Sequence, residues 1–240
     1  MKLVQISTIS TILVIVLGIA MVAPGFIRTT PPLTAILSFS ITDDENTPLW
    51  CEQLSNVLKK HNVKAIVFVT GQIADKYPTC ITTFSHDVDI GSQTYHYLSL
   101  PSIKDYTVEL EEVKNGKMAV DRAGNLHSSL FKSPYGETDQ NIYSLLNRAN
   151  ISADFSYSTQ YNLYQNGKFI KYDLTEYSGI DHSSNFFSSL STTKPVLIDF
   201  DNSTPIDKID KFVSELKSEN IHFVTASELT SVPLTIWESK

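Results

Sequence analysis

The chain has 240 residues, of which 42% are hydrophobic, and its formal net charge is −7 at pH 7. This length and apolar content are enough for one sizeable core, so a single main domain is expected. The mildly acidic balance, with no block of basic residues, excludes the usual electrostatic basis for binding nucleic acid.

The N-terminal segment is long and uncharged. Residues 11–27 contain no Asp, Glu, Lys or Arg, and the run extended back to residue 7 or 8 is about 20 residues long, roughly the minimum for a helix that crosses a bilayer. A cleaved signal peptide is the alternative, although residues 21–24, Met-Val-Ala-Pro, are a poor cleavage site. We predict a membrane anchor (a transmembrane helix) or signal segment at residues 1–28. Either interpretation places the remainder outside the cytosol, anchored at the cell surface or secreted if the leader is cut.

A Thr/Pro-rich linker at residues 29–33 leads into alternating apolar runs and amphipathic stretches, which predict an α/β domain over residues 34–230 and a tail at 231–240. Thr47 is predicted to cap the first helix, with Pro48 at its first position. Residues 160–193 are rich in Tyr, Ser and Asn and predict loops with one strand. Because helices separate the strands, the sheet should be largely parallel. Strands are predicted at residues 35–39, 64–69, 88–90, 151–157, 169–174, 195–200 and 221–225, and helices at residues 49–61, 103–119, 138–148 and 206–217.

Cys51 and Cys80 are the only cysteines. A disulfide between them would close a loop of about 30 residues, worth about 3 kcal/mol on the chain-entropy model. Two buried free thiols are the alternative, and the sequence does not decide between them.

Three motifs carry a resemblance to a known family. Residues 91–100 read Gly-Ser-Gln-Thr-Tyr-His-Tyr-Leu-Ser-Leu and follow a predicted strand, residues 58–71 pass from helix to strand, and residues 131–136 read Phe-Lys-Ser-Pro-Tyr-Gly. The first resembles the metal-binding loop Gly-Asn-His-Thr-x-Ser-His-x-x-Leu of the polysaccharide deacetylase (NodB-homology) family. The last is similar to that family's Phe-Arg-x-Pro-Tyr-Gly. The resemblance covers about residues 33–225.

The resemblance implies a fold and a chemistry. It implies a distorted (β/α) barrel that removes acetyl groups from N-acetylated sugars. A divalent metal held by one Asp and two His would polarise the amide carbonyl and activate water. A second Asp would act as general base, a late His as general acid, and a tyrosine main-chain N–H would face the developing oxyanion.

The chain departs from the family at the residues that carry this chemistry. The family's two histidines correspond to Gln93 and Tyr97. The family's Asp-Asp pair corresponds, without gaps, to Ser40 and Ile41. Asp43 and Asp44 follow three residues later, and only a local insertion would bring them into register.

Further differences follow along the chain. Lys132 stands where the family has Arg, and an ammonium cannot hold a carboxylate in two parallel hydrogen bonds as a guanidinium does. Pro134, Tyr135 and Gly136 are kept. The late strand has no His, and Asp199, Phe200 or Asp201 could occupy its place. His96 lies one position out of register and is interpreted as a loop residue.

Three hypotheses remain. We favour a divergent member of the family with degenerate metal-site motifs, which binds an N-acetylated polysaccharide or cell-surface glycan without cleaving it and needs no cofactor or metal ligand. The second hypothesis is an active N-deacetylase, a hydrolase of non-peptide C–N bonds, that uses zinc or another divalent metal at an altered site. The third is a non-catalytic surface interaction module in residues 157–187. The candidate catalytic residues are Asp43, Asp44, Lys132 and Tyr135, and the candidate substrate-binding residues are Gln93, Tyr97, Pro134, Tyr135, Gly136 and Asp201, with Tyr161 as a further groove aromatic.

Overall fold

The structure, a computed structural model, describes residues 33–177, 194–219 and 221–238. The anchor or signal segment predicted at residues 1–28 lies outside these residues. Within the described part of the chain, no helix combines the length and apolarity that crossing a membrane requires.

Ten strands form one mixed sheet in the order β8-β7-β6-β5-β3-β2-β1-β10-β9, and β11 also pairs with β1. All pairs are parallel except those of β7 with β6 and β8. The predicted α/β class and largely parallel sheet are therefore confirmed. No pairing among the described strands joins β8 to β9, so the sheet is half-barrel-like rather than closed. The strands are β1 (Thr34–Ile41), β2 (Ala65–Val69), β3 (Val88–Ser92), β5 (Leu130–Phe131), β6 (Ala153–Asp154), β7 (Gln160–Gln165), β8 (Lys168–Asp173), β9 (Thr175–Tyr177), β10 (Val196–Asp201) and β11 (His222–Phe223).

Strand β1 shows how the alternation of side chains builds two cores. Leu37 and Phe39 belong to one apolar cluster, whereas Ile36 belongs to another on the opposite face. Because side chains alternate along a strand, Ser38 and Ser40 lie on the Ile36 face. This face therefore changes from apolar to polar toward the carboxyl end of β1.

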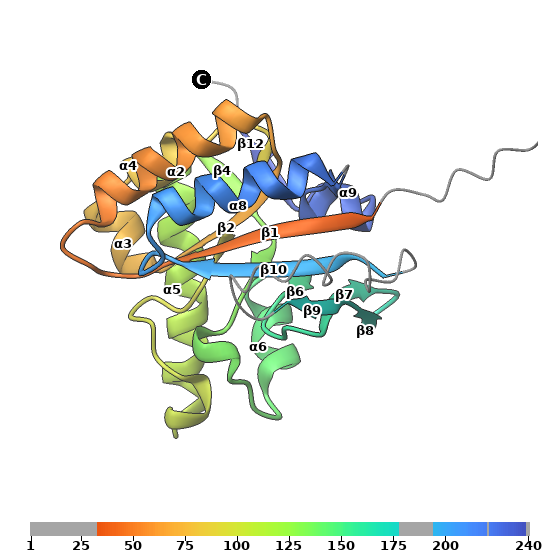
Figure 1. The fold of residues 1–240 in the computed structure, drawn as a ribbon. Coiled ribbons are helices and arrows are strands. Elements are labelled where there is room, and N and C mark those ends of the chain that lie inside the picture. The colour runs from red at the N-terminus through yellow and green to blue at the C-terminus, as the bar shows by residue number, and fades with distance from the viewer. Residues whose placement is uncertain (1–32, 178–193, 220, 239–240) are drawn as a thin grey trace, which may run out of the picture. The chain divides into compact units, whose positions relative to one another are not determined.

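Helices cover the Phe39 face of the sheet, and α2 and α8 lie along it beside β1 and β10 (Figure 1). Asp210 of α8 accepts hydrogen bonds from Lys60 and contacts His61 at the end of α2. A third apolar cluster packs α5 against α6. The helices are α2 (Thr47–His61), α3 (Gly71–Lys76), α4 (Thr79–Thr82), α5 (Tyr106–Gly124), α6 (Ile142–Arg148), α8 (Ile206–Ser218) and α9 (Ala226–Thr230).

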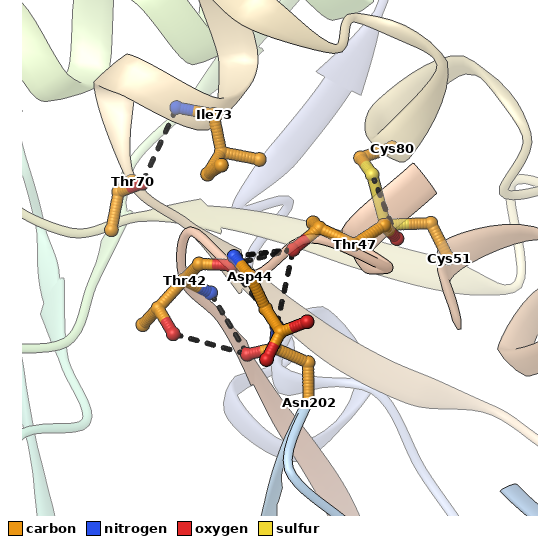
Figure 2. The surroundings of a disulfide bond; sticks show 8 residues. All are labelled: Thr42, Asp44, Thr47, Cys51, Thr70, Ile73, Cys80 and Asn202. Carbon is orange, nitrogen blue, oxygen red and sulfur yellow. Dashed lines mark hydrogen bonds between the residues drawn. A yellow bond between two sulfur atoms is a disulfide. The ribbon is translucent and has the colours of Figure 1, made fainter. Parts of the chain in front are cut away.

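Cys51 of α2 and Cys80 of α4 form a disulfide, with their Cα atoms 5.2 Å apart (Figure 2). The alternative of two free thiols is therefore wrong. The cross-link ties together two helices that both pack on the Phe39 face.

Several boundaries differ from the predicted ones. Helix α2 begins at Thr47, one residue early, with Asn46 as its N-cap. The Thr47 hydroxyl instead accepts a hydrogen bond from the Asp44 main chain. Residues 235–237, in the predicted tail, form β12 (Thr235–Trp237), which pairs with β4 (Leu126–Ser128).

Candidate functional site

A cavity of about 740 Å³ opens at the carboxyl ends of the parallel strands. This is where α/β sheets and barrels of this kind usually place their chemistry, since loops from several strands meet there. Strands β1, β3, β5, β6 and β10 all contribute residues at or just after their ends. The lining residues are Ser40, Gln93, Tyr97, Lys132, Ser133, Tyr135, Gly136, Phe155, Ser156, Tyr157, Ser158, Thr159, Tyr177, Leu197, Asp199, Phe200, Asp201, Ser203 and Thr204.

Lys132 is the central charged group of the cavity. Its ammonium donates hydrogen bonds to the Ser40 hydroxyl at 3.0 Å and to Asp199 Oδ2 at 2.5 Å. The Lys132 side chain is only 11% exposed, whereas Asp199 is 42% exposed. The register of β1 against β10 places Asp199 beside Ser38 and Asp201 beside Ser40. The ion pair therefore joins the ends of β5 and β10, which β3, β2 and β1 separate in the sheet.

The loop after β3 holds Gln93 and Tyr97 at the cavity wall. Gln93 N–H donates to the carbonyl of Val69, which continues the β3 ladder by one residue. Gly116 of α5 lies so close to the Gln93 carbonyl that a Cβ at this position would clash with it. The Gln93 side chain is 1% exposed, and its Oε1 is buried without a hydrogen-bond partner.

Tyr97 and Tyr135 form an aromatic pair, with ring centroids 4.8 Å apart. Both residues have positive φ, 59° in each case, which is uncommon for residues other than glycine. Burial raises the pKa of Tyr97; the nearby main chain of Tyr135 opposes this shift, and the carboxylates of Asp201 and Asp199 add to it. Tyr135 is 66% exposed and forms part of the rim.

A buried network supports the Pro-Tyr-Gly turn. The Ser133 N–H donates to the Ser156 hydroxyl at 2.8 Å, and Ser156 in turn donates to Asp154. Burial raises the pKa of Asp154, although its hydrogen bonds with Ser156 and Asn162 oppose the shift. Gly136 has φ of 69°, and a Cβ there would lie 3.0 Å from the Ser156 carbonyl oxygen, so this position requires glycine.

Asp43 and Asp44 are not among the residues that line the cavity. Asp43 is paired with Lys76 at 3.1 Å on the surface. Asp44 Oδ1 accepts from the main chain of Asn46, so its carboxylate shapes the turn into α2. The Asn202 side chain, just after β10, hydrogen-bonds to the main chain of Thr42 and so holds the loop that carries Asp43 and Asp44, as Figure 2 shows for Thr42, Asp44 and Asn202.

Other candidate positions also lie away from the cavity. His96 contacts Glu112 of α5 at 2.7 Å through Nδ1, and it does not line the cavity. Tyr161 was expected in the groove, but it is 6% exposed and stacks between Phe155 and Tyr172 in the core. Burial raises its pKa to about 12. The alternation along β7 turns Tyr161 inward, so the prediction for this residue was wrong.

The structure brings together Gln93, Tyr97, Lys132, Tyr135, Gly136 and Asp201 from the predicted set. Pro134 is buried beneath them in the short 3₁₀ turn Pro134–Gly136. Tyr157 and Tyr177 also line the cavity, and the sequence interpretation did not single them out for this site. Both lie within residues 157–187, the stretch of the third hypothesis, whose Tyr-rich composition was the available signal. Of the proposed interaction module, residues 178–187 lie outside the described residues.

The profile of the polysaccharide deacetylase family matches residues 29–153, slightly more than half of the chain. The chain belongs to the polysaccharide deacetylase family.

Relatives of this polysaccharide deacetylase-like chain are distant. A peptidoglycan-N-acetylglucosamine deacetylase from Bacillus cereus is 23% identical over 195 residues, which cover 78% of this chain and 66%, just under two thirds, of that protein. A peptidoglycan deacetylase from Bacillus subtilis has a TM-score of 0.58 at 15% identity, covering 84% of this chain and 92% of that one. A CE4 family pseudoenzyme from Bacillus anthracis also has a TM-score of 0.58, at 13% identity, covering 82% and 66%. At these identities the structural likeness shows the fold alone.

Proposed function

We propose that this polysaccharide deacetylase-like domain binds an N-acetylated glycan in the cavity and does not hydrolyse it. The observation that carries the proposal is the Lys132 ammonium, which lies between Ser40 and Asp199 at the carboxyl end of β1. A fixed cation bound to the protein's own carboxylate thus contacts Ser40, the residue that by resemblance stands where the family has its general base.

The side chains at the family's ligand positions do not fit a divalent metal. By resemblance these positions are Ile41, Gln93 and Tyr97, none of which is a carboxylate or an imidazole. Zinc is held by anionic carboxylate or thiolate and by imidazole, and neutral amide and phenol oxygens are poor substitutes. Ile41 is fully buried in the core. Within the described residues there is no cluster of three or more His, Cys, Asp or Glu that could hold an ion.

The cavity nevertheless has the composition of a sugar-binding site. Tyr97, Tyr135 and Tyr157 offer aromatic surface on which sugar rings stack, and serine and threonine hydroxyls with the Gln93 amide offer hydrogen bonds. A relative at 23% identity carries the name of a peptidoglycan-N-acetylglucosamine deacetylase, which favours a glycan as the ligand class. The CE4 pseudoenzyme from Bacillus anthracis is an example of this fold without activity.

We further propose that the domain works outside the cytosol, held there by the N-terminal segment. The Cys51–Cys80 disulfide supports this location, because such bonds persist mainly in oxidising compartments. The test is whether both cysteines are inaccessible to a thiol reagent in protein isolated without reductant from the producing cells. Free thiols in that protein would contradict the proposed location.

The proposed function is tested by measuring the metal content of the purified chain together with acetate release from N-acetylated chitin oligosaccharides. We expect no stoichiometric metal and no acetate above the no-protein control, with saturable oligosaccharide binding. The alternative of an active deacetylase with an altered site predicts bound zinc and released acetate. Substituting Asp43 or Asp44 by Asn should change neither result, since both carboxylates lie away from the cavity.

A further inference from the structure

Among its described lining residues, the cavity has more negative than positive side chains. Lys132 is the single cation among the described lining residues, and Asp199 and Asp201 are the two anions. Because Lys132 is committed to Asp199 and Ser40, the cavity keeps an excess of one negative charge. An anionic ligand would meet repulsion there, and a cationic ligand would meet attraction.

Asp201 retains capacity to accept hydrogen bonds. Its Oδ1 accepts from the main-chain N–H of Ser203 at 2.9 Å and from the Ser203 hydroxyl at 2.5 Å. Within the described residues no side chain or main-chain group donates to Oδ2. The residue is exposed toward the cavity that it lines. One carboxylate oxygen therefore remains for a donor from outside the protein.

Gln93 is an independent second observation. Its side chain is 1% exposed at the cavity wall, and its Oε1 has no hydrogen-bond partner. A buried acceptor without a donor is costly, and a ligand that supplies the donor removes that cost. The terminal torsion of a glutamine is soft, so a ligand that offers a donor would select the rotamer that turns the amide oxygen toward it.

The aromatic pair adds a surface for a ring that carries positive charge. Tyr97 and Tyr135 lie 4.8 Å apart at the cavity, and the carboxylates of Asp199 and Asp201 are close enough to raise the pKa of the Tyr97 phenol. Tyrosine faces attract ammonium groups and stack on sugar rings. Acceptors, anionic charge and aromatic faces thus lie together.

We propose that the cavity selects a glycan with a free amino group, a 2-amino sugar in its ammonium form, over the fully N-acetylated form. This rests on the proposed function and names the sugar unit that the cavity prefers. The ammonium would donate to Asp201 and Gln93 while the sugar ring lies against Tyr97. The reaction class that supplies such a ligand is hydrolysis of an N-acetyl amide on a glycan. The protein would therefore recognise what a hydrolytic deacetylase leaves behind.

The test is calorimetric titration of the full-length chain with two chitin-derived oligosaccharides of equal length, one fully N-acetylated and one fully deacetylated. The pH is held at about 6, where an amino group of this kind carries its proton. We expect the deacetylated oligosaccharide to bind about tenfold more tightly, the factor that one nearby charge provides at intermediate dielectric. Equal or weaker binding of the deacetylated form would overturn this proposal and leave the proposed function standing. If neither oligosaccharide binds, the proposed function and this inference fail together.

A matched pair of variants separates the cavity from the protein's overall acidity. Asp201→Asn keeps the Oδ1 acceptor for Ser203 and removes the charge, so the fold should persist. Asp43→Asn removes the same charge at a surface position outside the cavity. We expect D201N to lose most of the preference and D43N to retain it. Equal losses in both variants would show general attraction of a cationic oligosaccharide and would overturn the proposal.

Discussion

In the ion pair between Lys132 and Asp199, removing the carboxylate should lower the free energy of unfolding more than removing the ammonium. The Lys132 side chain is 11% exposed and the Asp199 side chain 42% exposed. Removing Asp199 leaves a poorly solvated ammonium with Ser40 as its remaining hydrogen-bond partner. Removing Lys132 leaves a carboxylate that water reaches. Breaking a fully buried pair costs about 3–5 kcal/mol, and hydrogen bonds to charged groups contribute about 1.5–3 kcal/mol.

For this half-buried pair we expect Asp199→Ala to lower the free energy of unfolding by about 2 kcal/mol, since only the lysine is deeply buried. Lys132→Met keeps the aliphatic length over Phe68 and should cost about 1 kcal/mol or less. The double variant should resemble Lys132→Met alone, which gives a coupling of about 1–2 kcal/mol.

The assay is urea unfolding followed by the fluorescence of Trp50 and Trp237, with linear extrapolation. Asp43→Ala is the matched control, because Asp43 is 43% exposed and also pairs with a lysine, but Lys76 is 48% exposed. Its urea midpoint should not move, as expected for a surface ion pair. The reasoning that the buried ammonium depends on its carboxylate would be refuted by either of two results. One is a double variant whose loss of unfolding free energy equals the sum of the two single losses, and the other is an Asp199→Ala variant as stable as the wild type.

Replacing Cys51 and Cys80 together by Ser should lower the free energy of unfolding by about 3–4 kcal/mol, because the bond closes a loop with a sequence separation of 29; a loss below about 1 kcal/mol in the same urea assay would contradict this. Burial raises the pKa of Asp154, so the native state holds this proton more tightly than the unfolded chain, and stability should fall as pH rises from about 4 through the raised value. In Asp154→Asn the urea midpoint should depend less on pH over that range. The same pH dependence in the variant and the wild type would contradict its assignment to Asp154. Tyr97→Phe removes only the phenol hydroxyl and should weaken oligosaccharide binding less than Tyr97→Ala, which also removes the ring that pairs with Tyr135; equal losses would show that the ring does not contact the sugar.

Much of the sheet was predictable because its strands are apolar and regular. The residues of β1 and β2 alternate between two buried faces, and both strands were predicted close to their observed bounds. Strand β7 was missed because its sequence, Gln-Tyr-Asn-Leu-Tyr-Gln, is largely polar. A signal was nevertheless present: Asn166 and Gly167, both with positive φ, join β7 to β8 as a two-residue hairpin turn.

The site was less predictable because it depends on contacts distant in the sequence. The chain order does not tell whether Asp199, Phe200 or Asp201 faces Lys132, which lies 67 residues before Asp199. Pairing of β10 with β1 determines the answer, since it aligns Asp199 with Ser38. Likewise Asp43 and Asp44 resemble a catalytic pair in composition, but their positions beyond the end of β1 direct them to Lys76 and to the turn into α2.

The most direct test of a glycan-binding cavity that works without metal is the affinity for an N-acetylated chitin oligosaccharide in two matched titrations. One uses protein treated with a chelator and dialysed, and the other uses the same protein supplied with zinc. We predict dissociation constants that agree within about twofold and no acetate in either sample. Binding that appears only with zinc, or acetate released in its presence, would contradict the account and restore catalysis to this domain.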